Sequence, residues 1–373
     1  MAIGLSHGGS NVYSSPERSR ELWVGTQDGL VMFTREDSGN WREAHRALRG
    51  QHISSIIFER TSGTIFVGAF FGSIHASTDG GKTWERRDNG MPVHDVYSLA
   101  CKIVDGKVRV YAGTQPAHLF VSEDMGHHWT ELSSLRSVPT VAQWTFPAAP
   151  HVAHTKFITF DPQDEKTIYA CIEQGAFLKS TDEGKSWTEL NTVGLLADKN
   201  RPVEHFYDVH RCLIDPRDPK RIYVTGGAGL YVTYSGGGSW ERWMSPEWPV
   251  DVYPDGFTWN PKNPDEMFVA TAEHNPQTWR KAGSAARAEG KIYRSRNGGK
   301  NWQRLGGGLP ASLKHEFGAL CLEESNDKCS IFGGTTGGEL FYSDDDGETW
   351  MLISSSSLAP ISKKGHERLL AAS

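Results

Sequence analysis

Short apolar runs recur along the chain in groups of four, and glycine, aspartate and proline separate them. One group reads KFITFDP, KTIYACIE, GAFLKSTDEG and SWTEL between residues 156 and 190. The next reads HRCLIDP, RIYVTGG, GLYVTYSGGG and SWERW between residues 210 and 243. Apolar runs of this length between turn residues predict β-strands. Each group therefore predicts one four-stranded unit.

An octapeptide of the form S-x-D-x-G-x-x-W marks the same point in successive units. Clear copies are STDGGKTW at 77–84, STDEGKSW at 180–187 and SDDDGETW at 343–350. Seven candidate copies end at Trp41, Trp84, Trp129, Trp187, Trp240, Trp302 and Trp350. Four strands in about 45 residues are typical of a propeller blade. We predict an all-β fold, a single seven-bladed β-propeller of four-stranded antiparallel blades over residues 1–373, with a C-terminal tail at 358–373 whose role the sequence leaves open.

The octapeptide is the Asp box, or BNR repeat, and the chain resembles the BNR/Asp-box β-propellers of the sialidase-like and sortilin-like superfamily over nearly its whole length. The box is expected to fix a turn, because a short aspartate can bond turn backbone and glycine can adopt a positive φ. The structural aspartates are Asp79, Asp124, Asp182 and Asp345. The family includes sialidases, other glycosidases, sorting receptors and photosystem assembly factors, so the resemblance predicts fold rather than function.

Composition excludes some classes of function. The net charge of −6 argues against a nucleic-acid partner, which would require a basic face. No stretch approaches the roughly 18 apolar residues of a membrane helix, and the N-terminus does not resemble a signal peptide. Five scattered cysteines without a CxxC pair predict buried free thiols. We therefore expect a cytoplasmic protein without a membrane partner, and the oligomeric state stays open.

Unequal spacing between the boxes reveals three insertions, at 132–153, 191–207 and 273–290. The first two fall in links between blades, and the third lies between the second and third strands of the sixth unit. By the connectivity of a propeller, all three would lie on the face opposite the Asp boxes. Long loops gathered on one face of a rigid scaffold commonly carry a binding site.

Histidines are frequent, and several lie near the start of the first strand of a blade. Crowded imidazoles with nearby carboxylates fit a divalent transition metal, although a histidine cluster for anions or substrate and a purely structural role stay open. The predicted metal ligands are His52, His94, His154, His210 and His315. The candidate catalytic carboxylates are Glu173, Asp255 and Glu273, and the candidate substrate-binding residues are His118, Gln174, Tyr253, His274 and Trp279.

These residues predict a metal-dependent hydrolase that acts on a small molecule, with a carboxylate as general base. A lyase with an imidazole base and a metal oxygenase are alternatives at the same site. A protein-binding or assembly propeller is a further alternative, supported by the cationic stretch WRKAGSAARAEGK at 279–291. A sialidase is disfavoured because the arginine motif of that family is missing, and a glycosidase because no pair of carboxyl groups stands out.

Overall fold

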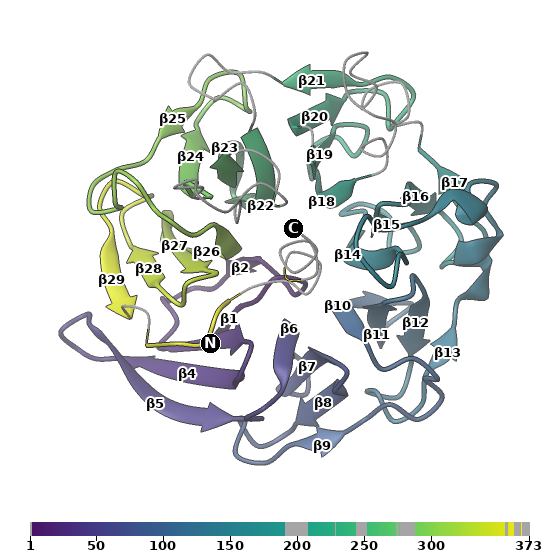
Figure 1. The fold of residues 1–373 in the computed structure, drawn as a ribbon, viewed down its shortest axis with the longest axis horizontal. Coiled ribbons are helices and arrows are strands. Elements are labelled where there is room, and N and C mark those ends of the chain that lie inside the picture. Colours follow the sequence, from purple (N-terminus) through teal and green to yellow (C-terminus); the bar gives the residue numbers. More distant parts are fainter. Residues whose placement is uncertain are drawn as a thin grey trace. The chain divides into compact units, whose positions relative to one another are not determined.

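The computed structural model of the chain describes residues 2–190, 208–227, 229–243, 252–273, 276, 288–354, 357–361 and 367. Its strands form seven antiparallel blades, as Figure 1 shows, and the fold is the predicted all-β, seven-bladed β-propeller. Six sheets have four strands, and the seventh gains a fifth from the N-terminal segment. None of the helices in the described part of the chain has the length and apolar character of a membrane span.

The strands of the first four blades follow the order of the sequence, apart from β2. Blade 1 comprises β1 (Ala2–Leu5), β3 (Glu21–Thr26), β4 (Gly29–Arg35) and β5 (Trp41–Ala47). Blade 2 comprises β6 (His52–Glu59), β7 (Thr64–Phe70), β8 (Ser73–Ser77) and β9 (Glu85–Arg86). Blade 3 comprises β10 (Val96–Val104), β11 (Lys107–Thr114), β12 (Leu119–Ser122) and β13 (Thr130–Glu131). Blade 4 comprises β14 (His154–Phe160), β15 (Ile168–Glu173), β16 (Phe177–Ser180) and β17 (Thr188–Glu189).

The last three blades have the same plan. Blade 5 comprises β18 (Val209–Ile214), β19 (Ile222–Gly226), β20 (Gly229–Thr233) and β21 (Glu241–Trp243). Blade 6 comprises β22 (Val252–Asn260), β23 (Asn263–Glu273), β24 (Lys291–Ser295) and β25 (Gln303–Arg304). Blade 7 comprises β26 (Phe317–Ser325), β27 (Lys328–Thr335), β28 (Leu340–Ser343) and β29 (Met351–Ser354), joined by β2 (Val12–Ser14). Of the three predicted insertions, 132–153 contains two short 3-10 helices, η1 (Ser133–Ser137) and η2 (Val141–Gln143), whereas 191–207 and 274–275 with 277–287 lie outside the described residues.

The chain divides into two compact units. Unit 1 comprises Met1–Phe58 and Ser245–Ser373, and unit 2 comprises Glu59–Met244. Within unit 2, the first strand of each blade packs on the preceding blade, β10 on β7, β14 on β10 and β18 on β14. Within unit 1, β22 packs on β26 and β26 on β1. The predicted free thiols are confirmed, because all five cysteines are unbridged and four of them are buried.

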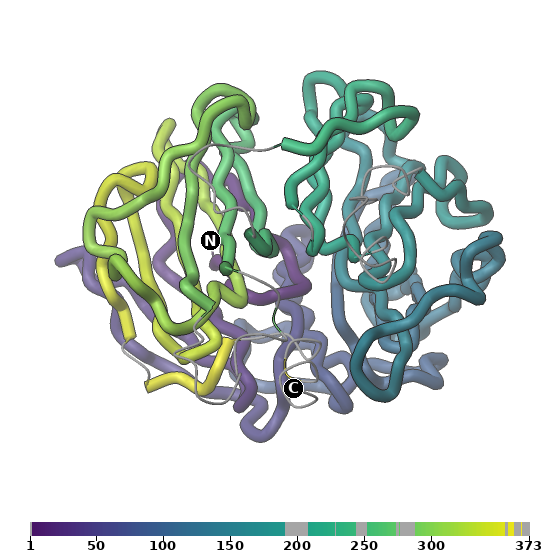
Figure 2. Tube along the Cα trace, turned by 45° about the horizontal axis from the view of Figure 1, so that its top comes forward, coloured from purple at the N-terminus to yellow at the C-terminus, as the bar shows by residue number. Residues whose placement is uncertain are grey.

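The N-terminal segment joins the last blade to the first inside unit 1. β2 pairs in parallel with β26, with Val12 opposite Leu322, and β1 pairs in parallel with β3. The hydroxyl of Tyr13 donates to Gly4 O at 3.0 Å and so ties the two short strands together. Figure 2 shows this purple segment among the green and yellow strands of the same unit. Blades 1 and 7 therefore share one continuous piece of chain.

The C-terminal residues 357–361 also pack within unit 1. Leu358 and Ile361 are buried in one apolar cluster with residues of β1, β3 and β27. The backbone N–H of Gln27 donates to Pro360 O at 2.9 Å, and that of Ile361 donates to Thr335 O at 3.0 Å. The tail, whose role the sequence left open, thus covers apolar surface of blades 1 and 7.

Each well-formed Asp box closes the turn between the third and fourth strands of its blade. In blade 4 the hydroxyl of Ser180 donates to Asp182 Oδ1 at 2.8 Å, and Gly184 N donates to the Ser180 hydroxyl at 2.8 Å. The hydroxyl and the backbone N–H of Ser186 donate to the two oxygens of Asp182. These bonds, the Ser186 hydroxyl first, hold the pKa of Asp182 at about 2. The backbone N–H of Thr83 is the main cause of an equal lowering of the pKa of Asp79, to about 2.

We expect acid to weaken the blades through these turns. A carboxyl whose pKa is lower in the folded state stabilises the protein above its ordinary pKa of 3.8. That contribution is lost as the pH falls towards 2, where the folded state takes up the proton. Urea denaturation of the wild type and of Asp182→Asn between about pH 6 and pH 2.5 measures it, because the variant should lose less stability in acid than the wild type. Parallel pH curves would contradict this role of Asp182. Asn297 shows that an amide fits the turn, since its Oδ1 accepts from Asn301 N at 3.0 Å.

Candidate functional site

Unit 2 contains a group of buried ionisable side chains, which we call the buried cluster: His154, Lys156, Glu173, Asp208 and His210. The strand ends bring them together. His154 opens β14 directly opposite Glu173, the last residue of β15. An isolated β-bridge then links Glu173 to Asp208, the residue just before β18. The side chains are at most 8 % exposed, so the cluster is closed to bulk water.

Glu173 is the centre of this cluster. Its Oε2 is hydrogen-bonded to His154 Nε2, and its Oε1 accepts from Lys156 Nζ at 3.0 Å. His210 Nε2 lies 3.6 Å from the same Oε1 and 3.1 Å from Asp208 Oδ1. Two carboxylates, one ammonium group and two imidazoles therefore meet in a volume without solvent, where electrostatic interactions are strong.

The surroundings fix the geometry of the cluster. The ring of Tyr97 lies on His154 with 3.8 Å between centroids, and Phe146 lies 5.4 Å away on another side. Gly227 has no side chain where a Cβ would collide with Asp208 Oδ2. Burial is the largest single effect on the pKa of Asp208 and raises it, but the charge and the nearby N–H of His210, together with the charge of Lys156, lower the pKa overall. Asp208 is therefore expected to be ionised at neutral pH.

The five predicted metal ligands are divided between the two units. His154 and His210 meet around Glu173, whereas His94 in the same unit is 45 % exposed and lies 3.3 Å from Asp88. His52 and His315, in unit 1, each have a carboxylate of their own, Glu367 at 3.4 Å and Glu339 at 3.1 Å.

Sequence reasoning missed Lys156 and Asp208, although a signal was present. Alternate residues of a strand point to the same face. Lys156 follows His154 by two positions, and Asp208 precedes His210 by two. Both residues could therefore have been predicted as site residues from the positions of the two histidines.

A second group of charged residues, in unit 1, is partly exposed, and we call it the surface cluster: Glu273, Glu289, Lys291, His315 and Glu339. Lys291 pairs with Glu273 at the end of β23, and the Glu273 side chain is 30 % exposed. The hydroxyl of Ser312 donates to Glu289 Oε1 at 3.0 Å. Backbone bonds join these parts, since Glu273 N donates to Ala288 O at 2.7 Å and Ala288 N to Lys314 O at 2.9 Å.

The dyad of His315 and Glu339 belongs to the same cluster. Its carboxylate also accepts from the Thr335 hydroxyl. Burial raises the pKa of Glu339, but the Thr335 hydroxyl and the nearby His315 lower it overall. The Glu339 carboxylate is therefore expected to be ionised and partly open to solvent at neutral pH.

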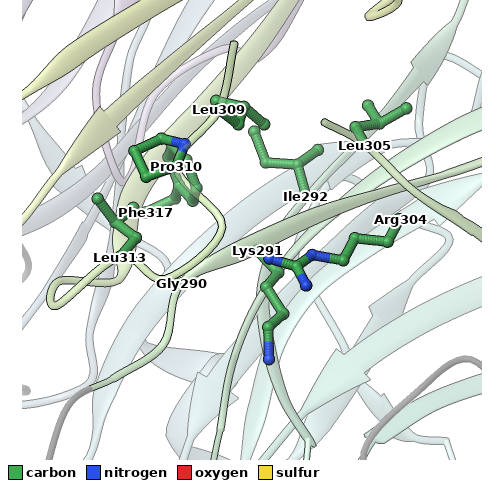
Figure 3. A pocket seen from close by; sticks show the side chains of 9 residues that line it. All are labelled: Gly290, Lys291, Ile292, Arg304, Leu305, Leu309, Pro310, Leu313 and Phe317. Carbon is green, nitrogen blue, oxygen red and sulfur yellow. The ribbon is translucent and has the colours of Figure 1, made fainter. Parts of the chain in front are cut away.

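A small hollow lies beside the surface cluster and shares residues with it. Its cavity volume is about 10 Å³, which is room for roughly one water molecule. Its lining consists of Gly290, Lys291, Ile292, Arg304, Leu305, Leu309, Pro310, Leu313 and Phe317. In Figure 3 the Lys291 side chain points away from the leucines. The hollow therefore has an apolar wall next to charged groups, but it is far smaller than the pockets of roughly 300 to 1,000 Å³ in which small ligands are commonly buried.

The remaining predicted residues are placed as follows. Asp255 and Tyr253 lie on β22 and are buried, and Asp255 Oδ2 is 4.0 Å from His7 Nδ1. Gln174 forms the turn after β15 with φ of 59°, and its carbonyl accepts from Thr145 N. His118 Nδ1 is hydrogen-bonded to Glu131 at 2.8 Å. His274 and Trp279 lie outside the described residues.

Comparisons with known proteins agree on the repeat. The BNR/Asp-box repeat family matches residues 75–86. A probable oligoxyloglucan-reducing end-specific xyloglucanase of Neosartorya fischeri is 26 % identical over 227 residues, which cover 52 % of this chain and 25 % of that enzyme. A xyloglucanase of Acetivibrio thermocellus is 27 % identical over 210 residues, 52 % of this chain and 24 % of that enzyme. The chain thus spans about a quarter of the length of these relatives.

A solved structure supports the fold. YCF48 from Cyanidioschyzon merolae aligns with a TM-score of 0.58 at 16 % identity, over 92 % of this chain and 94 % of that one. At this identity the likeness shows the fold alone.

These relatives overturn the predicted function. The expectation of a metal-dependent hydrolase with a small-molecule substrate is wrong, and so is the expectation that a glycosidase is unlikely, because the curated relatives are glycosidases named for a polysaccharide. The physical origin of the error lies in the histidines, because His52, His94 and His315 each have a carboxylate partner of their own. The repeated Asp boxes, the matching repeat model and the seven blades together show what the chain is: a β-propeller built of BNR/Asp-box repeats.

Proposed function

We propose that the chain acts as a glycoside hydrolase on a polysaccharide of the xyloglucan class. The observation that carries this proposal is the similarity of half the chain to xyloglucanases of a fungus and of a bacterium. The matched region is much longer than one Asp box, so the similarity is not that of a single turn motif.

Glycoside hydrolysis generally uses two carboxyl groups on either side of the bond to be cleaved. The buried cluster does not meet this need, because Glu173 is 1 % exposed and Asp208 6 %. The surface cluster offers Glu273 and Glu339, which are partly exposed; Glu273 pairs with Lys291, which lines the hollow, and Glu339 pairs with His315. We assign these two carboxyl groups as the catalytic pair. The His315 imidazole and the Lys291 ammonium group then hold them in place.

The proposal is tested with the purified full chain and soluble xyloglucan, with cellulose and starch as comparison polysaccharides. We expect new reducing ends from xyloglucan, detected by a reducing-sugar assay, and retarded migration of the protein in gels that contain xyloglucan. If the protein neither hydrolyses xyloglucan nor is retarded by it, the proposal is overturned and a protein-binding propeller is favoured. Retardation without hydrolysis would overturn the catalytic part of the proposal.

A further inference from the structure

We propose that the buried cluster of unit 2 binds one divalent transition-metal ion, with Glu173 Oε1, Asp208 Oδ1 and His210 Nε2 as its ligands. This site is separate from the proposed hydrolysis by the surface cluster of unit 1, and its role is structural: the ion links β15 of blade 4 to the start of β18 of blade 5.

The distances fit such an ion. The three residues each offer a ligand atom, and these atoms all lie within 4.8 Å of one another. Two separations are 3.1 Å and 3.6 Å. A tetrahedral zinc ion with bonds of about 2.0 to 2.1 Å separates its ligand atoms by about 3.3 Å. The two separations from His210 Nε2 are thus close to those between the ligands of such an ion.

The Asp208 carboxylate supplies an independent observation. Its Oδ1 is buried, and no described residue donates a hydrogen bond to it with proper geometry, although His210 Nε2 is only 3.1 Å away. Buried carboxylate oxygens without a donor are costly and therefore rare. An ion between this oxygen and the imidazole nitrogen would remove the cost. The absence of a side chain at Gly227 keeps the Asp208 carboxylate in this position.

The neighbouring groups fit the role of supporting partners. His154 and Lys156 both bond to the Glu173 carboxylate, and ligating carboxylates are commonly hydrogen-bonded in this way. A carboxylate oxygen has two lone pairs, so Oε1 can accept from Lys156 and bind an ion at the same time. The competing arrangement contains no ion. In it, the Lys156 ammonium group and one protonated imidazole balance the two carboxylates.

The test is the metal content of the full chain, produced without a histidine tag or chelator in zinc-supplemented medium and measured by mass spectrometry after gel filtration. We expect about one zinc per wild-type chain, and a loss of about tenfold or more in Asp208→Asn. The matched control is Cys329→Ser. Cys329 belongs to a second group of possible metal ligands, with Glu266 and Asp346, whose ligand atoms also lie within 4.8 Å of one another. The control variant should keep the zinc.

Each other result overturns the proposal. A wild type without zinc does so whether or not Asp208→Asn folds. Loss of zinc in Cys329→Ser, but not in Asp208→Asn, would place the ion in unit 1. If the wild type contains no zinc but Lys156→Met binds it, the Lys156 ammonium group occupies the position between the carboxylates that the proposal gives to the ion. Removal of the ion by a chelator should leave the hydrolysis of xyloglucan unchanged. The metal content and the hydrolysis assay therefore test the two proposals separately.

Discussion

Glu273→Gln is expected to lower kcat for xyloglucan hydrolysis by about 10³-fold, the usual contribution of a catalytic carboxyl group. An amide of the same shape keeps the packing at the end of β23, but it can neither ionise nor transfer a proton. Glu339→Gln should act in the same direction. Initial rates of reducing-end release at saturating xyloglucan measure both effects.

The matched control for this experiment is Glu85→Gln. Glu85 lies on β9 in an exposed ion pair with Arg87 at 2.9 Å, so the variant also removes one paired carboxylate from the surface. Its kcat should equal that of the wild type. If Glu273→Gln hydrolyses xyloglucan as fast as Glu85→Gln, the catalytic carboxyl groups lie elsewhere in the chain.

Glu173→Ala is expected to lower the free energy of unfolding by about 3 to 5 kcal/mol. The variant leaves the Lys156 ammonium group without its carboxylate at 3.0 Å, and the Lys156 side chain is 1 % exposed. It also removes the group that bonds to His154. Urea denaturation of the full chain, followed by tryptophan fluorescence, measures the change.

A compensating pair of substitutions separates charge from packing. Glu173→Leu with Lys156→Met replaces the ion pair by apolar side chains of similar size, and such replacements are often neutral or stabilising. The double variant should regain the part of the stability that Glu173→Ala loses through the Lys156 charge, but not the part that the proposed ion contributes. An equal loss in both proteins would show that shape, rather than an unpaired buried charge, controls stability here.

The repeat made most of the fold predictable. Each Asp box fixes a turn through bonds among residues only a few positions apart, such as Ser180, Asp182 and Ser186, so the pattern can be read locally. The glycines and aspartates between the apolar runs delimit the strands in the same way. The placement of β2 in blade 7 could not be read, because it depends on pairing with residues such as Leu322 at the other end of the sequence.

The candidate site was predictable only in part. His154, His210 and Glu173 lie at strand ends whose neighbours follow from blade order, so their meeting could be anticipated. The partners of His52, His94 and His315 come from separate turns, and no spacing in the sequence reveals them. The substrate class could not be derived from the histidine pattern at all. The proposed substrate class rests instead on the similarity to xyloglucanases.

The pairing of β2 with β26 has a consequence for synthesis on the ribosome. Blade 7 and the junction with blade 1 cannot form until about 300 further residues have been translated, which takes roughly 15 to 60 s at about 5 to 20 residues per second. During that interval β2 lacks its partner strand, and its backbone edge stays exposed. The growing polypeptide is therefore most vulnerable to aggregation before its last blade emerges, and chaperone demand should fall sharply once β26 leaves the exit tunnel.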